Sequence, residues 1–439
     1  MQRAASTFMK SARERLSAEA AQLWWLRPAP LVLLIIVPLY LSFLAFDYEN
    51  VVQRRYVPNA NYVWGLVLLV VLALGAALGA GMGGGSSASD ADNAPLRPDL
   101  RIPAWFTAPL LVFTLLAYVI WFGPLALEPS LVFEVFSGDR DNVRDVLQTM
   151  PGVTTLTQCG AAFVVLVTIK RFSVGGAAFW ERAGIWLVLL LAIGRALMWA
   201  ERLAVLEIVV PWAVTTAAFY RFRTLRGVRL AVVLPLIGPI VLFFAFAGTE
   251  YFRSWRFYQH YYDSIWQFAY ERLMTYYAVA SNSGIGLLEE AQDWPRYTGR
   301  FVFEWAWTMP KLGKILIDAF GDTRTDFGRF LLDYGDKEFN NPSGLFPIVY
   351  DIGYFGSALY FFLVGTLVGL ARASYARRHA LGLMFYPFCV LFILELLRFN
   401  YLAASRFVPI AGSLVVALYL VYDLPRRRQP QKLPAWRRT

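Results

Sequence analysis

The sequence predicts an all-α protein, a polytopic membrane helical bundle of about ten transmembrane helices with one large extracytoplasmic loop containing interfacial helices. Hydrophobic residues make up 58% of the 439 positions, and charged residues only 16%. A soluble chain of this length needs far more charge to cover its surface. The apolar residues also form long runs separated by short charged clusters, as membrane-spanning helices do.

The apolar runs divide the chain into five parts. Residues 1–28 form a basic cytoplasmic segment, and residues 29–249 carry the first seven predicted spans. Residues 250–342 form the large extracytoplasmic loop, residues 343–422 carry the last three spans, and residues 423–439 form a basic cytoplasmic tail. The predicted spans are residues 29–46, 61–82, 104–127, 154–170, 184–199, 203–220, 229–249, 343–371, 381–399 and 403–422.

The N-terminal region does not look like a cleaved signal. A secretory signal has a shorter apolar core followed by a small-residue cleavage site. Here Phe46 is followed by Asp47, Tyr48 and Glu49. We therefore expect a retained first span, preceded by an amphipathic helix on the surface of anionic lipid.

Basic residues gather on alternate connections between the predicted spans. These residues are Lys170, Arg171 and Arg182, then Arg221, Arg223, Arg226 and Arg229, then Arg372, Arg377 and Arg378, and finally Arg426, Arg427 and Arg428. The positive-inside rule assigns all these connections, and both termini, to the cytoplasm. We expect a multi-pass protein of a bacterial inner (cytoplasmic) membrane. In such a protein the net charge of +10 sets orientation and does not indicate nucleic-acid binding.

The large loop is rich in aromatic residues at helical spacing. We predict that residues 255–280 form a helix, with Trp255, Tyr262 and Trp266 facing a cavity or the lipid interface. One interpretation is an interfacial aromatic belt. The other is a wall that packs against sugar rings, and the two are compatible.

Several motifs suggest nucleotide or metal chemistry but stand in the wrong context. The glycines from Gly79 to Gly84 fit a GxGxxG string but close an apolar span and follow no strand. Close helix packing through Gly75, Gly79 and Gly83 is the better interpretation. Asp90-Ala91-Asp92 lies in a Gly/Ser-rich linker. We predict no metal site and no cofactor, and Cys159 and Cys389 have no metal-ligand spacing.

Four arginines approach the outer leaflet in the predicted topology: Arg195, Arg202, Arg398 and Arg406. Charged groups at such positions are costly and often mark functional sites. One interpretation is structural, with Arg202 paired to Glu201 or Glu207, and Arg398 paired to Glu395. The other is a shared anion site, because guanidinium groups bind phosphate in a bidentate manner. A lipid-attached diphosphate suits such a site.

Residues 340–346 (NNPSGLF) and 350–356 (YDIGYFG) open the eighth predicted span with a polar, glycine-containing entry and an Asp-x-Gly-x-x-Gly stretch. Together with residues 151–154 (PGVT) and the Gly194-Arg195 pair, this resembles the oligosaccharide repeat-unit polymerases, the Wzy-type polymerases of O-antigen and exopolysaccharide. The resemblance extends over most of the chain in layout, with many spans, a large late extracytoplasmic loop and a basic tail.

The resemblance implies a membrane glycosyltransferase that depends on lipid phosphosugars. Such an enzyme polymerises polyprenyl-diphosphate-linked oligosaccharide repeat units into a surface polysaccharide, at the extracytoplasmic face of the inner membrane. Its partners are the lipid-linked oligosaccharide, membrane lipid, and a chain-length regulator and a flippase of the same pathway. The arginines expected to stabilise the leaving diphosphate are Arg195, Arg202, Arg398, Arg406 and, from the loop, Arg272.

The acceptor hydroxyl must lose a proton, and a side chain can assist. We expect His260 or Asp351 to take this catalytic role, in competition with Asp263, Glu250 and Glu271. Two alternatives to the polymerase remain. One is a ligase that passes the glycan from the lipid carrier to another acceptor. The other is a transporter or flippase for lipid-linked sugars, which should carry its charges near the bilayer midplane.

Overall fold

The computed structural model describes residues 23–46, 52, 54–57, 59–83, 98–137, 146–147, 149–150, 152–199, 201–219, 225–292, 296–321, 323–336 and 338–428. Throughout these ranges the regular secondary structure is helical, which confirms the predicted all-α class. The N-terminal segment, the Asp90-Ala91-Asp92 motif and most of the C-terminal tail lie outside the described residues.

Each predicted span overlaps a helix or a run of helices. In chain order these are α2 (Pro28–Leu31), η2 (Val32–Ile36) and α3 (Val37–Ser42), then α4 (Ala60–Met82), α6 (Ala104–Leu127), α9 (Val153–Leu156) with α10 (Cys159–Phe172), α11 (Phe179–Met198), α12 (Leu203–Ala217), α13 (Leu225–Glu250), α19 (Phe346–Ala376), α20 (Ala380–Glu395) and α21 (Phe407–Arg428).

Within the described part of the chain, four of these helical segments are long and apolar enough to cross a membrane by length and composition. They are Ala60–Met82, Ala104–Leu125, Val153–Phe172 and Phe346–Ala376. Shorter apolar helices accompany them, among them Ala380–Glu395. The structure therefore indicates a multi-pass membrane protein.

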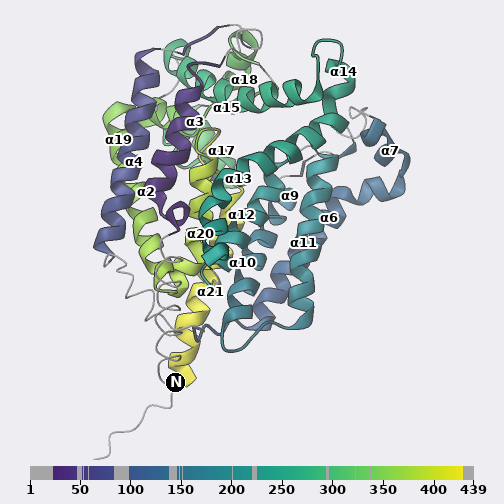
Figure 1. Cartoon of the computed structure of the whole chain (residues 1–439), viewed down its shortest axis with the longest axis vertical. Helices are drawn as coiled ribbons and strands as arrows, with labels where there is room; N and C mark the ends of the chain where they lie inside the picture. The colour runs from purple at the N-terminus through teal and green to yellow at the C-terminus, as the bar shows by residue number, and fades with distance from the viewer. Residues whose placement is uncertain are drawn as a thin grey trace, which may run out of the picture.

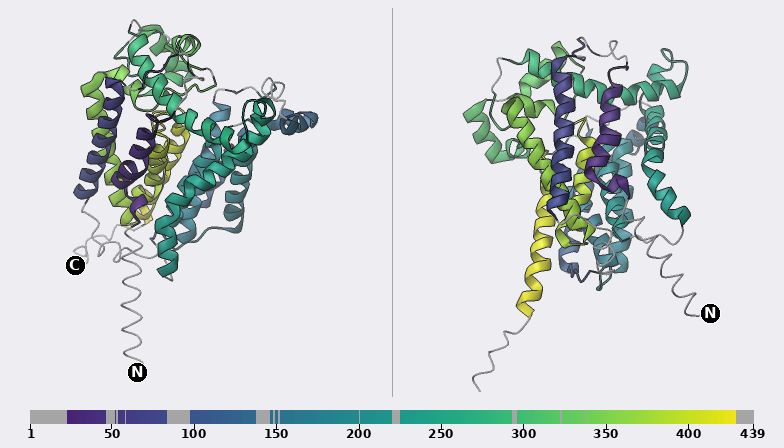
Figure 2. Two further views of the ribbon diagram at one scale, coloured as in Figure 1. Left: turned by 45° about the horizontal axis from the view of Figure 1, so that its top comes forward. Right: turned by 60° about the vertical axis from the view of Figure 1, so that its left-hand side comes forward.

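The long helices run roughly along one axis (Figure 1). The upper end in that view carries η3 (Tyr251–Trp255), α14 (Arg256–Tyr258), α15 (Ile265–Glu290) and α18 (Thr323–Asp333), and we call it the loop end. The segment before α18 contains α16 (Glu304–Thr308) and α17 (Pro310–Phe320). At the opposite end α21 extends away from the bundle (Figure 2). There the Arg378 Nε atom donates to the Ala218 carbonyl oxygen at 2.9 Å, which joins the ends of α19 and α12.

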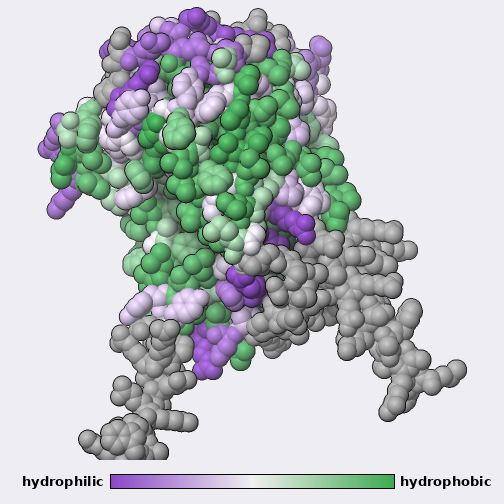
Figure 3. Space-filling view, turned by 90° about the vertical axis from the view of Figure 1, so that its left-hand side faces the viewer, coloured by the Kyte–Doolittle hydropathy of each residue, from purple (hydrophilic) through white to green (hydrophobic). Residues whose placement is uncertain are grey.

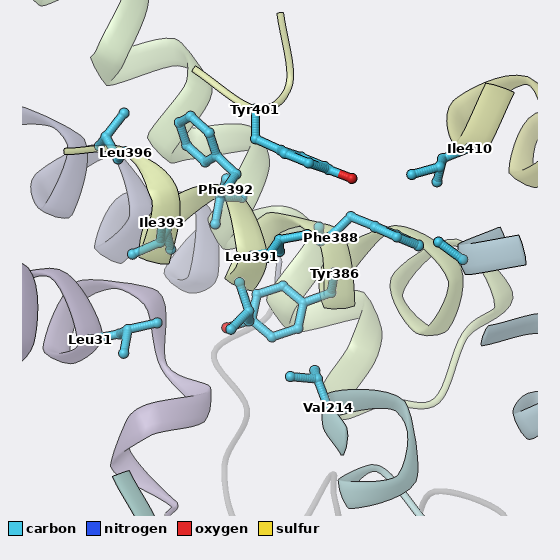
Figure 4. Packing of buried hydrophobic residues seen from close by; sticks show 14 of the residues in the cluster. Leu31, Val214, Tyr386, Phe388, Leu391, Phe392, Ile393, Leu396, Tyr401 and Ile410 are labelled. Atoms are coloured by element: carbon cyan, nitrogen blue, oxygen red, sulfur yellow. The ribbon is translucent and has the colours of Figure 1, made fainter. Parts of the chain in front are cut away.

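The core of the bundle is built around α20, whose side chains are buried along most of its length. Figure 4 shows Phe388 and Phe392 of α20 among Val214 of α12, Leu31 of α2 and Ile410 of α21. All five side chains are at most 5% exposed. Burial of α20 on all sides explains why its hydrophobicity has no preferred face.

Helices α4 and α19 pack closely through facing glycines. A Cβ atom on Gly75 or Gly79 would collide with the backbone of α19, and one on Gly365 or Gly369 with the backbone of α4. A Cβ atom on Gly83 would collide with the Ala373 side chain. The predicted packing role of Gly75, Gly79 and Gly83 is therefore confirmed, and small residues are the usual means of close helix approach in membranes.

The outward face of this helix pair is apolar. Figure 3 shows a hydrophobic band on that side of the molecule, with hydrophilic residues gathered at the loop end. Its exposed large side chains include Val63, Leu74 and Leu78 of α4 and Leu359, Leu363 and Leu367 of α19. A soluble protein rarely exposes so extended an apolar surface, whereas lipid covers it at no cost.

The aromatic segment differs from the single helix predicted for residues 255–280. It forms η3 and α14, then a turn, then α15 from Ile265 onward. The break arises because Ser264 is extended and its side chain caps α15, accepting a hydrogen bond from the Gln267 amide at 3.2 Å. Trp255 packs on Phe268 with ring centroids 5.8 Å apart, and Trp266 is half exposed.

Candidate functional site

A cavity of about 690 Å³ opens at the loop end, where α12, α19 and α21 begin and where α13 and α20 end. Its walls come from segments far apart in the sequence. They are the connection before α12, the faces of α13 and α15, residues 300–304, residues 340–348 and residues 398–406. The volume is within the range of ligand-binding pockets in proteins.

Three of the predicted arginines line this cavity: Arg202, Arg398 and Arg406. The connection between α20 and α21 supplies two of them. Arg398 donates from Nη1 to Glu395 at 2.9 Å. Arg406 donates from Nη2 to Glu201 at 2.8 Å and from Nη1 to Glu207 at 3.0 Å.

Carboxylates beside the cavity orient these guanidinium groups. Glu201 lines the cavity and is shared, because Arg406 donates to its Oε1 atom and Arg195 to its Oε2 atom. Burial alone would raise the pKa of Glu201, but the adjacent guanidinium groups of Arg406 and Arg195 outweigh it, and the net pKa is lowered. Glu201 therefore stays ionised and holds both arginines in place.

Arg195 does not line the cavity. Its side chain is 6% exposed. It donates from Nε to Glu201 at 2.9 Å and from Nη1 to the Thr157 hydroxyl at 3.0 Å, and its guanidinium lies 4.9 Å from the Trp121 ring centroid. The structure thus brings Arg195 to the loop end with Arg398 and Arg406, as predicted from topology, but places it behind Glu201.

Arg202 and Arg272 share a carboxylate that the sequence did not indicate. The structural interpretation paired Arg202 with Glu201 or Glu207, yet its ion pair is with Glu250, at the end of α13. Arg272 Nε lies 3.0 Å from Glu250 as well, and its Nη2 atom binds Glu338. Arg272 is buried and lies outside the cavity lining.

The two predicted catalytic residues do not line the cavity either. His260 is exposed in the turn between α14 and α15. Asp351 is 1% exposed near the start of α19, and its carboxylate accepts hydrogen bonds from the backbone amides of residues 298, 299, 301 and 302. These contacts favour a positioning role for Asp351 over proton transfer.

A second part of the cavity lining is polar but uncharged. Asn340, Asn341, Ser343, Asn400 and Ser405 line it. Asn400 is 7% exposed and donates to the Tyr360 hydroxyl at 2.8 Å. Among the described residues, its Oδ1 atom is buried without a hydrogen-bond partner, and so is the Nε atom of Arg398. Such unpaired groups beside a cavity indicate a ligand or water that completes them.

A third part of the wall is apolar. Leu206, Leu242, Phe246 and Leu273 bring side chains from α12, α13 and α15 to the cavity. The site therefore joins a guanidinium wall, an amide and hydroxyl wall and an apolar wall. Sequence reasoning missed Arg300 and Asn400, which also line it. Asn400 follows the predicted site residue Arg398 by only two positions, and this proximity in the sequence could have indicated that it belongs to the same site.

Fold and site together define a helical multi-pass membrane protein with a mixed basic, amide and apolar cavity at one end of its bundle. The sequence matches no family model, and neither a curated protein nor a solved structure matches it.

Proposed function

We propose that this protein polymerises polyprenyl-diphosphate-linked oligosaccharide repeat units by glycosyl transfer at the extracytoplasmic membrane face. The observation that supports this best is the composition of the cavity. Guanidinium groups suit a diphosphate, apolar side chains suit the first part of a polyprenyl chain, and side-chain amides suit sugar hydroxyl groups. One lipid-linked sugar presents all three chemistries side by side.

In the proposed reaction, the acceptor sugar hydroxyl attacks the anomeric carbon of the donor. The bond to the diphosphate breaks, and the polyprenyl diphosphate leaves with increased negative charge. Arg398 and Arg406 stabilise that charge, because they are held in place before the reaction begins. We propose that a carboxylate of the cavity lining accepts the hydroxyl proton; in the described part of the chain the lining contains Glu201 and Glu304.

We propose that about ten helical segments cross the membrane, with the loop end outside and both chain termini in the cytoplasm. The arginine-bearing connection between α19 and α20 lies at the end opposite the cavity. At the loop end, α17 carries exposed Leu312, Ile315 and Phe320 beside exposed Lys311 and Lys314. This composition suits a helix that lies in the membrane interface.

Topology reporters test this orientation. A reporter fused after Arg378 should report the cytoplasm, and one inserted in the turn at His260 should report the outside. The expected difference follows from the basic connections, which resist translocation. A reporter at His260 that is cytoplasmic would place the cavity on the wrong side for lipid-linked repeat units and would exclude the proposed reaction.

The lipid-linked glycan of a strain that lacks the protein tests the function itself. We expect single repeat units on the carrier, exposed at the outer face, and restoration of long chains by the intact gene. Single units retained inside would indicate a flippase, and long chains left on the carrier would indicate a ligase. The cavity lies at the end of the bundle and not at mid-depth, which argues against transport.

A further inference from the structure

The Asp351 carboxylate organises the loop that precedes α16. Its Oδ1 atom accepts from the amides of Gly299 at 2.8 Å and Thr298 at 3.1 Å. Its Oδ2 atom accepts from the amides of Phe301 at 2.9 Å and Val302 at 3.3 Å. A carboxylate offers about four acceptor positions. These amides occupy them, so a substrate hydroxyl finds no place to donate its proton.

The backbone on both sides is shaped to allow this arrangement. Gly299 has φ +73° and Tyr297 has φ +59°, so the loop uses left-handed conformations to curl around the carboxylate. For Tyr297 this conformation is unfavourable unless other contacts maintain it. In the helix that carries the carboxylate, Gly353 interrupts α19 with φ +74°, two residues after Asp351.

The far end of the same loop is attached to the arginine wall. The Trp305 amide donates to the Ala403 carbonyl at 2.9 Å, in the connection that carries Arg398 and Arg406. Arg300 lies between these two attachments. Its side chain is 7% exposed, lies 5.7 Å from the centroid of the Trp307 ring, and lines the cavity.

We infer that Arg300 is a further ligand-binding residue of the cavity, and that Asp351 is the positioning residue that holds it there. The inference rests on the proposed function and names a contact to the lipid diphosphate from a chain segment separate from the one that carries Arg398 and Arg406. Asp351 acts through the loop backbone and does not touch the substrate. A guanidinium on a pinned loop loses little conformational entropy when it binds an anion.

Binding of farnesyl diphosphate to the purified full-length protein in lipid nanodiscs tests this inference. Arg300→Ala should weaken binding at least about tenfold, the effect of losing one charge-assisted contact. Arg300→Lys should recover only part of the affinity, because lysine lacks the planar fork. Arg296→Ala is the matched control, since Arg296 is exposed on the same loop and lies outside the cavity lining.

Asp351→Asn, alone and combined with Arg300→Ala, tests whether Asp351 positions Arg300 or takes part in catalysis. Asp351→Asn should weaken binding about as much as Arg300→Ala, and the two changes together should weaken it no further, because both act through one contact. Hydrogen exchange of the amides of residues 298, 299, 301 and 302 should accelerate in Asp351→Asn while exchange in α4 stays unchanged. This readout applies even if the variant binds poorly.

Two outcomes would overturn this inference and leave the proposed function standing. One is unchanged binding of farnesyl diphosphate by Arg300→Ala, and the other is an Asp351→Asn protein that binds it normally but makes no polymer. The second result would mark Asp351 as catalytic. Failure of the wild-type protein to bind farnesyl diphosphate would overturn the proposed function, and this inference with it.

Discussion

Arg406→Ala is expected to reduce polymer formation at least about a hundredfold, because Arg406 lines the cavity and is held there by two carboxylates, half-buried Glu201 and buried Glu207. The same change should destabilise the protein by about 3–5 kcal/mol, the usual cost of leaving one partner of a buried ion pair uncompensated. Thermal unfolding in detergent and glycan gels of the expressing strain measure the two effects.

A second variant distinguishes a lost binding group from a lost packing group. Glu201 retains Arg195 when Arg406 is removed, so the uncompensated carboxylate is mainly Glu207. Adding Glu207→Gln removes that charge. The new side chain keeps a polar neighbour, because in the wild-type protein Gln158 Nε2 donates to Glu207 Oε2 at 2.9 Å. We expect Arg406→Ala with Glu207→Gln to regain most of the stability and none of the polymer.

Full-length polymer from this stabilised double variant would show that Arg406 is a structural partner only, and the shared phosphate site would have to be abandoned. Arg195→Ala makes a useful comparison. Because Arg195 reaches the cavity only through Glu201, we expect its loss to affect stability strongly and affinity for the diphosphate weakly.

Gly79→Leu is expected to prevent the protein from accumulating, and Gly79→Ala should destabilise it by about 1–3 kcal/mol. Even a methyl group at this position would collide with the Thr366 backbone of α19, which cannot move aside as a side chain can. Yield and unfolding temperature after purification in detergent measure the effect.

Gly81 provides a control two residues away in the same helix. Nothing lies within 4 Å of a Cβ atom built on it. Because alanine favours helix over glycine by about 1 kcal/mol, Gly81→Ala should be neutral or stabilising. Equal destabilisation by Gly79→Ala and Gly81→Ala would show that the effect comes from this stretch of helix in general and not from contact with α19.

The charged groups at the loop end illustrate how a membrane protein can hold several arginines close together. Each of the arginines at Arg195, Arg398 and Arg406 has a carboxylate partner, so the resting site is paired and not an uncompensated cluster of positive charge. The mutual repulsion of these arginines is therefore already offset before any substrate binds. Substrate binding must instead compete with, or add to, existing ion pairs.

Hydropathy and glycine spacing were sufficient to predict the apolar helices and the close packing of the glycine face of α4, whereas only the structure identifies α19 as the partner helix. Membrane spans are local features, because every backbone polar group in lipid must be satisfied within its own helix. The same reasoning placed Arg195, Arg398 and Arg406 at one end of the bundle. The turn at Ser264 was missed because the aromatic spacing continues across it.

The sequence by itself therefore determined the class of fold, the helical segments and the arginines that share one end of the bundle. Only the tertiary structure decided that Glu201 separates Arg195 from the cavity, that Glu250 is the partner of Arg202, and that four backbone amides between residues 298 and 302 bind Asp351. The physical reason is the sequence distance over which each interaction acts. Hydropathy and helix formation depend on neighbours along the chain, whereas ion pairs and cavity walls depend on which distant side chains the packed helices bring together.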